Sequence, residues 1–136
     1  MRHQLKGKKL NRNTKQRKAL FKNLISALII HGQIKTTISK AKAVKKLTDK
    51  LMIKAKQGTV HSRRQILAFL ADKKAAFKLI DEIAPSNAKR QSGFTRFTRL
   101  GKRRGDDAMM VRLELIDKPA VLKKQKGKKE EKSAKD

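Results

Sequence analysis

The first 48 residues of the chain contain 14 Lys or Arg and no Asp or Glu, and Asp49 supplies the first carboxylate. A charged helix face usually mixes both signs, so that ion pairs form between residues i and i+4. No such pair is available within this segment, and its cations repel one another unless anions come from outside. The segment must therefore fold with its basic side chains turned toward solvent or an anionic partner.

The 136 residues include 38 Lys or Arg against 11 Asp or Glu, a formal net charge of +27. Such an excess indicates a polyanionic partner, with nucleic acid first and an anionic membrane surface second. The membrane alternative is weak, because the longest apolar run, at 24–30, is far shorter than the roughly 20 residues that span a bilayer. No secretory signal is recognisable, and the lack of Cys fits a reducing cytosol, so we expect a cytoplasmic protein.

Local signals define the first predicted elements. Asn13 can cap a helix that Gly32 ends, and Leu, Phe and Ile recur along it at helical spacing. A short β-branched stretch at 34–38 alternates with polar residues and predicts a strand. Ser39 is expected to cap a second helix that continues to about Lys56.

Two further helices are predicted before a turn-rich loop. Thr59 should cap the third helix and Asp72 the fourth, and Pro85 should mark the end of the fourth. Phe77 is expected to face inward from the fourth helix. The other inward positions of these two helices are Ile66, Leu67, Leu70, Ala76, Ile80 and Ile83.

The last two elements are predicted strands at 94–100 and 108–116, joined by a hairpin loop that begins at Gly101 and ends at Gly105. The order is therefore helix, strand, three helices, two strands. This order predicts an α+β fold with two layers, in which helices cover a small three-stranded sheet.

Catalysis finds little support in the sequence. The adjacent acid pairs are 81–82, 106–107 and 130–131, and turn formation accounts for the second of them. The three His share no metal-ligand spacing, and no phosphate-binding or dinucleotide fingerprint occurs. We therefore predict no enzyme activity, no cofactor, no metal site and no small-molecule substrate.

The arginines favour RNA as the polyanion. Six of the 11 Arg lie between residues 90 and 112, and a guanidinium suits bidentate contacts with phosphate at defined positions. We therefore expect ordered RNA contacts in the hairpin and nonspecific charge in the tail. The absence of Trp and Tyr argues against stacking of exposed bases.

A chromosome-associated DNA-binding protein is the main alternative, and an RNA-processing enzyme is a weaker one. A helix-turn-helix would need a short turn, but residues 31–39 are too many and too β-like for it. No heptad seam for dimerisation is present, so an obligate homo-oligomer is not expected.

Two stretches resemble a known family. They are LNRNTKQRKALFKNLISALIIHGQIKTTISKAKAVKKLTDKL, which starts at residue 10, and GFTRFTRLGKRRGDDAMMVRLELID, which ends at residue 117. Both are similar to the bacterial L-seventeen family of large-subunit (50S) ribosomal proteins. The resemblance implies the element order given above and a structural, noncatalytic constituent of the large ribosomal subunit. It also implies binding to 23S ribosomal RNA near the exit of the peptide tunnel, beside other large-subunit proteins.

These expectations divide the chain into three parts. Residues 1–12 are predicted to be a basic RNA-binding extension, residues 13–117 a single α+β domain, and residues 118–136 a Lys-rich disordered tail. The expected RNA contacts are basic or polar residues of the extension, the first helix, the first strand and the hairpin: Arg2, His3, Lys6, Lys8, Lys9, Asn11, Arg12, Asn13, Lys15, Arg17, Lys18, Lys22, Lys35, Thr36, Thr37, Lys40, Lys42, Arg96, Arg99, Lys102, Arg103 and Arg104.

Overall fold

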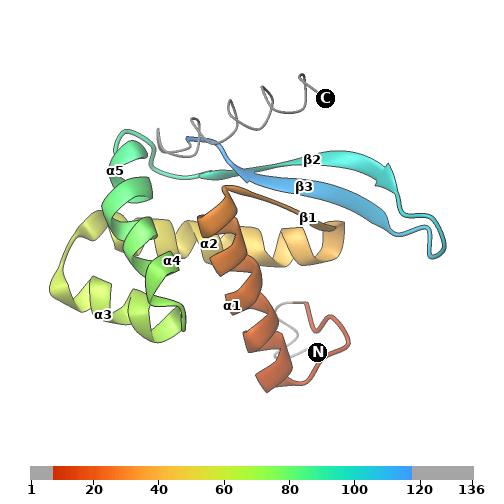
Figure 1. Cartoon of the computed structure of the whole chain (residues 1–136), viewed down its shortest axis with the longest axis horizontal. Helices are drawn as coiled ribbons and strands as arrows, with labels where there is room; N and C mark the ends of the chain where they lie inside the picture. Colours follow the sequence, from red (N-terminus) through yellow and green to blue (C-terminus); the bar gives the residue numbers. More distant parts are fainter. Residues whose placement is uncertain (1–7, 118–136) are drawn as a thin grey trace, which may run out of the picture.

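The computed structural model describes residues 8–117 of the chain. The first seven residues of the predicted extension and the whole predicted tail lie outside this range. Within it, the elements follow the predicted order of one helix, one strand, a group of helices and two strands (Figure 1).

The first helix and strand follow the local sequence signals. The helix α1 spans Thr14–His31, and the side chain of Asn13 caps it by accepting a hydrogen bond of 2.8 Å from the amide of Gln16. Gly32 ends it in a left-handed conformation, with φ of 71°. The strand β1 then spans Gln33–Thr37.

The second helix, α2, spans Ile38–Gln57 and starts before the predicted cap. The N-cap position belongs to Thr37, whose side chain makes no capping hydrogen bond, and Ser39 lies inside the first helical turn. The prediction of Ser39 as the cap was therefore wrong, because β1 leads into the helix without an intervening loop. Gly58 ends the helix in a left-handed conformation, close to the predicted end at about Lys56.

The remaining helices begin where predicted. The helix α3 spans Val60–Phe69, and α4 spans Lys73–Phe77. The chain continues without a break from α4 into the π-helical segment η1, Lys78–Ile83, and the short α5, Ala84–Ser86.

Two details of the fourth predicted helix were wrong. Phe77 is 50% exposed, because the inward positions fall in pairs at 75–76, 79–80 and 83–84 and leave residue 77 on the flank. The helical run ends at Ser86 rather than at Pro85, which lies within α5.

The last two strands are β2, Thr95–Lys102, and β3, Met109–Leu115. Both pairings are antiparallel, and the strand order is β1-β3-β2, so the last strand of the chain lies in the centre. A bulge interrupts the pairing between Arg99 and Gly101. Because β2 continues past this bulge to Lys102, the hairpin loop begins after Lys102, later than the predicted start at Gly101.

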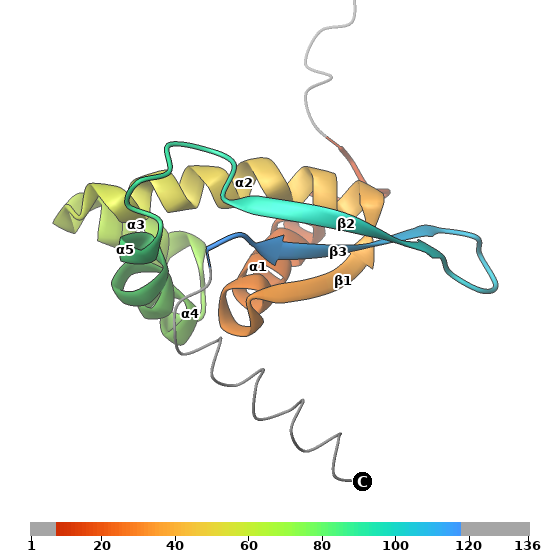
Figure 2. The same ribbon diagram turned by 90° about the horizontal axis from the view of Figure 1, so that it is seen from above.

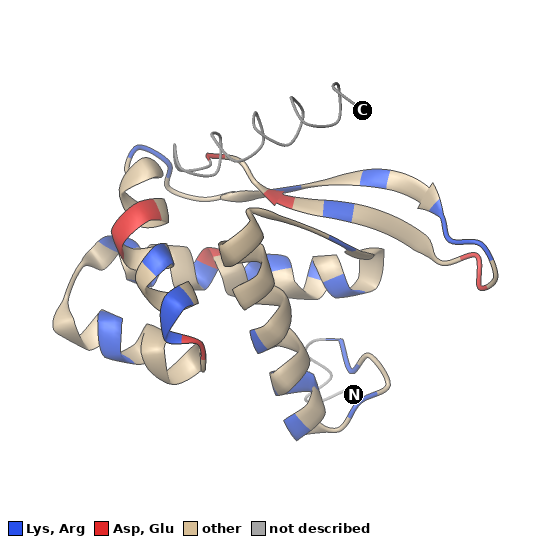
Figure 3. Ribbon diagram, viewed as in Figure 1, with Lys and Arg blue, Asp and Glu red and all other residues tan. Residues whose placement is uncertain are grey.

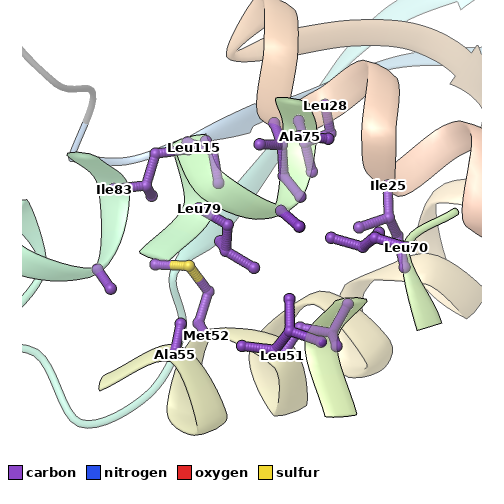
Figure 4. Packing of buried hydrophobic residues seen from close by; sticks show 14 of the residues in the cluster. Ile25, Leu28, Leu51, Met52, Ala55, Leu70, Ala75, Leu79, Ile83 and Leu115 are labelled. Carbon is purple, nitrogen blue, oxygen red and sulfur yellow. The ribbon is translucent and has the colours of Figure 1, made fainter. Parts of the chain in front are cut away.

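Helices cover one face of the sheet and enclose the core (Figures 1 and 2). Ile25 and Leu28 of α1 and Met52 of α2 are fully buried, and they pack with Leu79 of η1 and Leu115 of β3 (Figure 4). Alternation along β3 sends Val111, Leu113 and Leu115 into this core and the intervening residues outward. This arrangement confirms the predicted two-layer α+β fold.

Candidate nucleic-acid interface

The basic face of α1, defined here as Lys15, Lys18 and Lys22, lies in the N-terminal half of the helix, before its fully buried residues Ile25 and Ile29. Spacings of three and four residues bring these lysines onto one side of the helix. Lys15 and Lys18 are exposed, and Lys22 is partly buried. Figure 3 shows no acidic residue on α1. Between residues 8 and 48, no Lys or Arg forms an ion pair with any other residue in the described part of the chain.

A tight turn precedes α1 and carries the described part of the predicted extension. The amide of Arg12 donates to the carbonyl of Lys9 at 3.2 Å, and this bond closes the turn. Leu10 and Asn11, its two central residues, have φ values of 52° and 51°. A left-handed conformation is uncommon for a residue other than Gly, and especially for a bulky one such as Leu. The turn therefore needs support from its surroundings.

Arg17 supplies this support from the first turn of α1. Its Nη1 donates to the carbonyl of Arg12 at 2.8 Å and to that of Lys9 at 3.4 Å. Its Nη2 lies 3.5 Å from Thr14 Oγ1. Arg17 is predicted to contact RNA, but its guanidinium also donates hydrogen bonds to two backbone carbonyls of the protein itself. The neighbouring Lys8 and Lys9 remain exposed.

The predicted contacts in β1 and α2 lie partly on the surface. Lys35 and Lys42 are exposed, and Thr37 and Lys40 are partly buried. Thr36 is only 7% exposed, because it points from β1 toward the helices. Its side chain offers almost no surface to a partner, so we leave it out of the candidate interface.

The hairpin carries less net charge than its basic residues suggest, because the carboxylates of Asp106, Asp107 and Glu114 pair with three of its cations. In Figure 3, acidic and basic residues adjoin at its tip. Arg99 and Arg104 are exposed and form no ion pair within residues 8–117. The three ion pairs are Arg96–Glu114 at 2.9 Å, Lys102–Asp107 at 2.5 Å and Arg103–Asp106 at 2.6 Å.

The pair at the hairpin tip affects the titration of both partners. The Arg103 guanidinium donates two hydrogen bonds to the Asp106 carboxylate, of 3.0 and 2.6 Å. These bonds lower the pKa of Asp106 to about 2 and raise the pKa of Arg103. The pair stays fully ionised at neutral pH, so the tip carries little net charge.

Arg112 belongs to the basic surface although it is absent from the residues predicted above. It is partly exposed on the face of β3 opposite Val111 and Leu113, and pairs in register with Lys35 of β1 and Thr98 of β2. The alternation of β3 in the sequence already indicated an outward Arg112. Its position beside Lys35 depends on the register between β1 and β3, which could not be predicted from the sequence.

Two other kinds of site lack support in the part of the chain that the structure describes. Residues 8–117 contain no group of three or more His, Cys, Asp or Glu that could hold a metal ion. No helix in this range is long and apolar enough to cross a membrane. The candidate interface thus consists of basic and polar side chains alone.

Comparison with known proteins identifies the family. A family model described as ribosomal protein L17 matches residues 20–116. The chain belongs to the ribosomal protein L17 family. The resemblance noted in the sequence is thereby confirmed.

The similar proteins include three bacterial relatives that are each named large ribosomal subunit protein bL17. The relative from Clostridium acetobutylicum is 43% identical over 109 residues, which cover 80% of this chain and 96% of the relative. The one from Desulforapulum autotrophicum is 45% identical over 116 residues, or 85% of this chain and 97% of the relative. The one from Paramagnetospirillum magneticum is 46% identical over 123 residues, or 90% and 88% of the two chains.

Membership of a ribosomal-protein family also decides between a structural component and an enzyme. The chain is a structural component rather than an enzyme, as the sequence predicted. The RNA-processing alternative is thereby set aside.

Proposed function

We propose that this protein is a structural constituent of the large ribosomal subunit that binds and stabilises folded 23S ribosomal RNA. The relatives that are 43–46% identical to it over 80–90% of the chain are named as large-subunit proteins. Its other partners are neighbouring proteins of the same subunit. From the family resemblance we place it near the exit of the peptide tunnel.

The observation that carries this proposal is the unneutralised charge of the N-terminal half. Within residues 8–117, the cations of the basic face of α1 and of the turn at 8–12 form no ion pair with a carboxylate. A folded domain gains no stability from such a surface, whereas RNA phosphates can neutralise it and release counterions. Arg17 holds the turn in one conformation, which lowers the ordering cost of binding.

The RNA contacts are proposed for the residues whose side chains reach the surface. Arg17 positions this surface, and the paired cations of the hairpin contribute less than their number suggests. The proposed contacts among the described residues are Lys8, Lys9, Asn11, Arg12, Lys15, Lys18, Lys22, Lys35, Thr37, Lys40, Lys42, Arg99 and Arg104.

Sedimentation of a cell lysate tests the proposal. An affinity-tagged copy of the full chain should migrate with large ribosomal subunits through a sucrose gradient and remain there after a salt wash. Recovery with the nucleoid instead would contradict the proposal and favour the DNA-binding alternative.

A further inference from the structure

The outer face of the sheet brings two cations together. Lys35 of β1 lies directly opposite Arg112 of β3, which lies opposite Thr98 of β2. Residues that face each other across antiparallel strands lie on the same side, with Cβ atoms about 4.5–5.5 Å apart. The three side chains therefore form one row across the sheet, on the face opposite the buried Val111 and Leu113. We call this set the outer row.

The two cations of the outer row have no carboxylate partner within residues 8–117. Glu114, which lies two positions along β3 on the same face, accepts hydrogen bonds from Arg96 at 2.9 and 3.1 Å. Like charges directly opposite each other in a sheet are destabilising. Lys35 and Arg112 therefore repel each other in the folded protein, whereas an acidic residue at position 35 would stabilise the fold.

We infer that the outer row binds a phosphate group of RNA, and that the outer sheet face is a second RNA-binding surface separate from α1. This inference rests on the proposed function. A guanidinium fork, an ammonium and a hydroxyl together supply several donors for phosphate oxygens. Arg112 lies on the central strand, β3, whose backbone is fixed by pairing with a strand on each side.

The contact is with the RNA backbone rather than with its bases. Phe94 is fully buried, and Phe97 pairs with the inward-facing Leu113, so both rings lie on the helix side of the sheet. Lys45 of α2 lies over the Phe97 ring at 5.6 Å, which confirms that placement. Within residues 8–117 the outer row thus has no aromatic ring beside it on which a base could stack.

The decisive variant is K35E in the full-length protein, because its stability and its RNA affinity should change in opposite directions. The new carboxylate faces Arg112 and relieves the repulsion, so the thermal midpoint should rise or stay constant. Binding to 23S ribosomal RNA should weaken. The milder K35Q should bind roughly fivefold less tightly at 0.15 M salt, because one lost contact lowers the salt slope by about 0.8. K35E should weaken binding further.

A matched control is K73E, which makes the same charge change at an exposed position of α4. It should reduce affinity much less than K35E does. A second variant, R112Q, should lower the affinity and the salt slope by about as much as K35Q. If K35E and R112Q bind no more weakly than K73E, the inference is wrong. If K35E loses stability together with affinity, the outer row is structural and the inference also fails.

Two further measurements separate this inference from the proposed function. A variant with the α1 lysines replaced, K15Q/K18Q/K22Q, should lose affinity whether or not the outer row binds RNA. Failure of the unaltered protein to bind 23S ribosomal RNA would overturn the proposed function itself. If the outer-row variants bind RNA normally but no longer enter large subunits, an acidic protein occupies this face, and the inference of an RNA site is overturned.

Discussion

The basic face of α1 and the β2–β3 hairpin are both rich in Lys and Arg. They differ in net charge once the chain is folded. The lysines of α1 form no ion pair within residues 8–117, whereas the hairpin pairs three of its cations with Asp106, Asp107 and Glu114. The hairpin's partners lie in its own loop and in the adjacent strand. A count of basic residues therefore overstates the net charge of the folded hairpin but not that of α1.

The largest expected effect comes from removing the α1 charges. The variant K15Q/K18Q/K22Q should bind 23S ribosomal RNA about 100-fold more weakly at 0.15 M salt, with a salt slope lower by roughly 2–3 units, because three phosphate contacts are lost. Filter binding at several salt concentrations measures both quantities. The matched control K73Q/K74Q/K89Q removes the same charge from exposed positions elsewhere. Equal losses in the two variants would show that only net charge matters.

A smaller effect is expected from Arg17, because it acts through the turn rather than through its charge. R17K keeps the charge but loses the fork that binds the carbonyls of Lys9 and Arg12. Ordering the turn upon binding then costs about 1–2 kcal/mol, so affinity should fall by roughly tenfold.

Two readouts separate this positioning role from a direct phosphate contact. The salt slope of R17K should stay near that of the parent, and hydrogen exchange at the Arg12 amide should become faster. K18R provides a charge-conserving control in the same helix. If R17K binds as tightly as the parent, Arg17 does not position the turn.

A modest gain is expected when the hairpin is released from its own carboxylates. The double variant D106N/D107N frees Arg103 and Lys102, and RNA affinity should rise by roughly two- to tenfold if both cations then reach phosphates. D81N, which removes the partner of Arg63 on α3, is the control, since it makes a similar change away from the hairpin. Unchanged affinity in D106N/D107N would remove the hairpin tip from the interface.

The smallest effect concerns the titration of Asp106. Its pKa in the folded protein is about 2, against an ordinary value of 3.8, because Arg103 donates hydrogen bonds to the carboxylate. A lowered pKa means that the ion pair contributes its stability above pH 4 and loses it as the pH falls through about 2. NMR titration of the carboxyl carbon should show this midpoint, and R103Q should return it toward 3.8. A midpoint near 3.8 in the parent would show that the pair does not persist in solution.

Signals that act over a few residues were sufficient to predict much of the fold. The caps at Asn13, Thr59 and Asp72 all accept the expected hydrogen bonds, and Gly32 and Gly58 end their helices. These features depend on neighbouring backbone groups, which the sequence specifies directly.

Features that depend on tertiary contacts were not predicted. Phe77 was expected in the core because its helical phase could not be fixed without knowing where the sheet and α1 pack. The ion pair of Arg96 with Glu114 requires the register of β2 with β3. The hydrogen bonds of Arg17 to the carbonyls of Lys9 and Arg12 were not predicted, because charge alone does not show that a guanidinium will bind backbone carbonyls across a turn.

The position of β3 in the sheet has a consequence for the order of events during synthesis. Among the strands of residues 8–117, this one comes last in sequence, yet it pairs with both β1 and β2. A nascent chain can form α1 early, but its sheet must wait for residues 109–115, and such long-range pairing is slow. The Lys35–Arg112 neighbourhood then arises only in completed molecules. An RNA that binds both Lys35 and Arg112 would not bind truncated or unfolded chains. Only folded copies would then enter assembly.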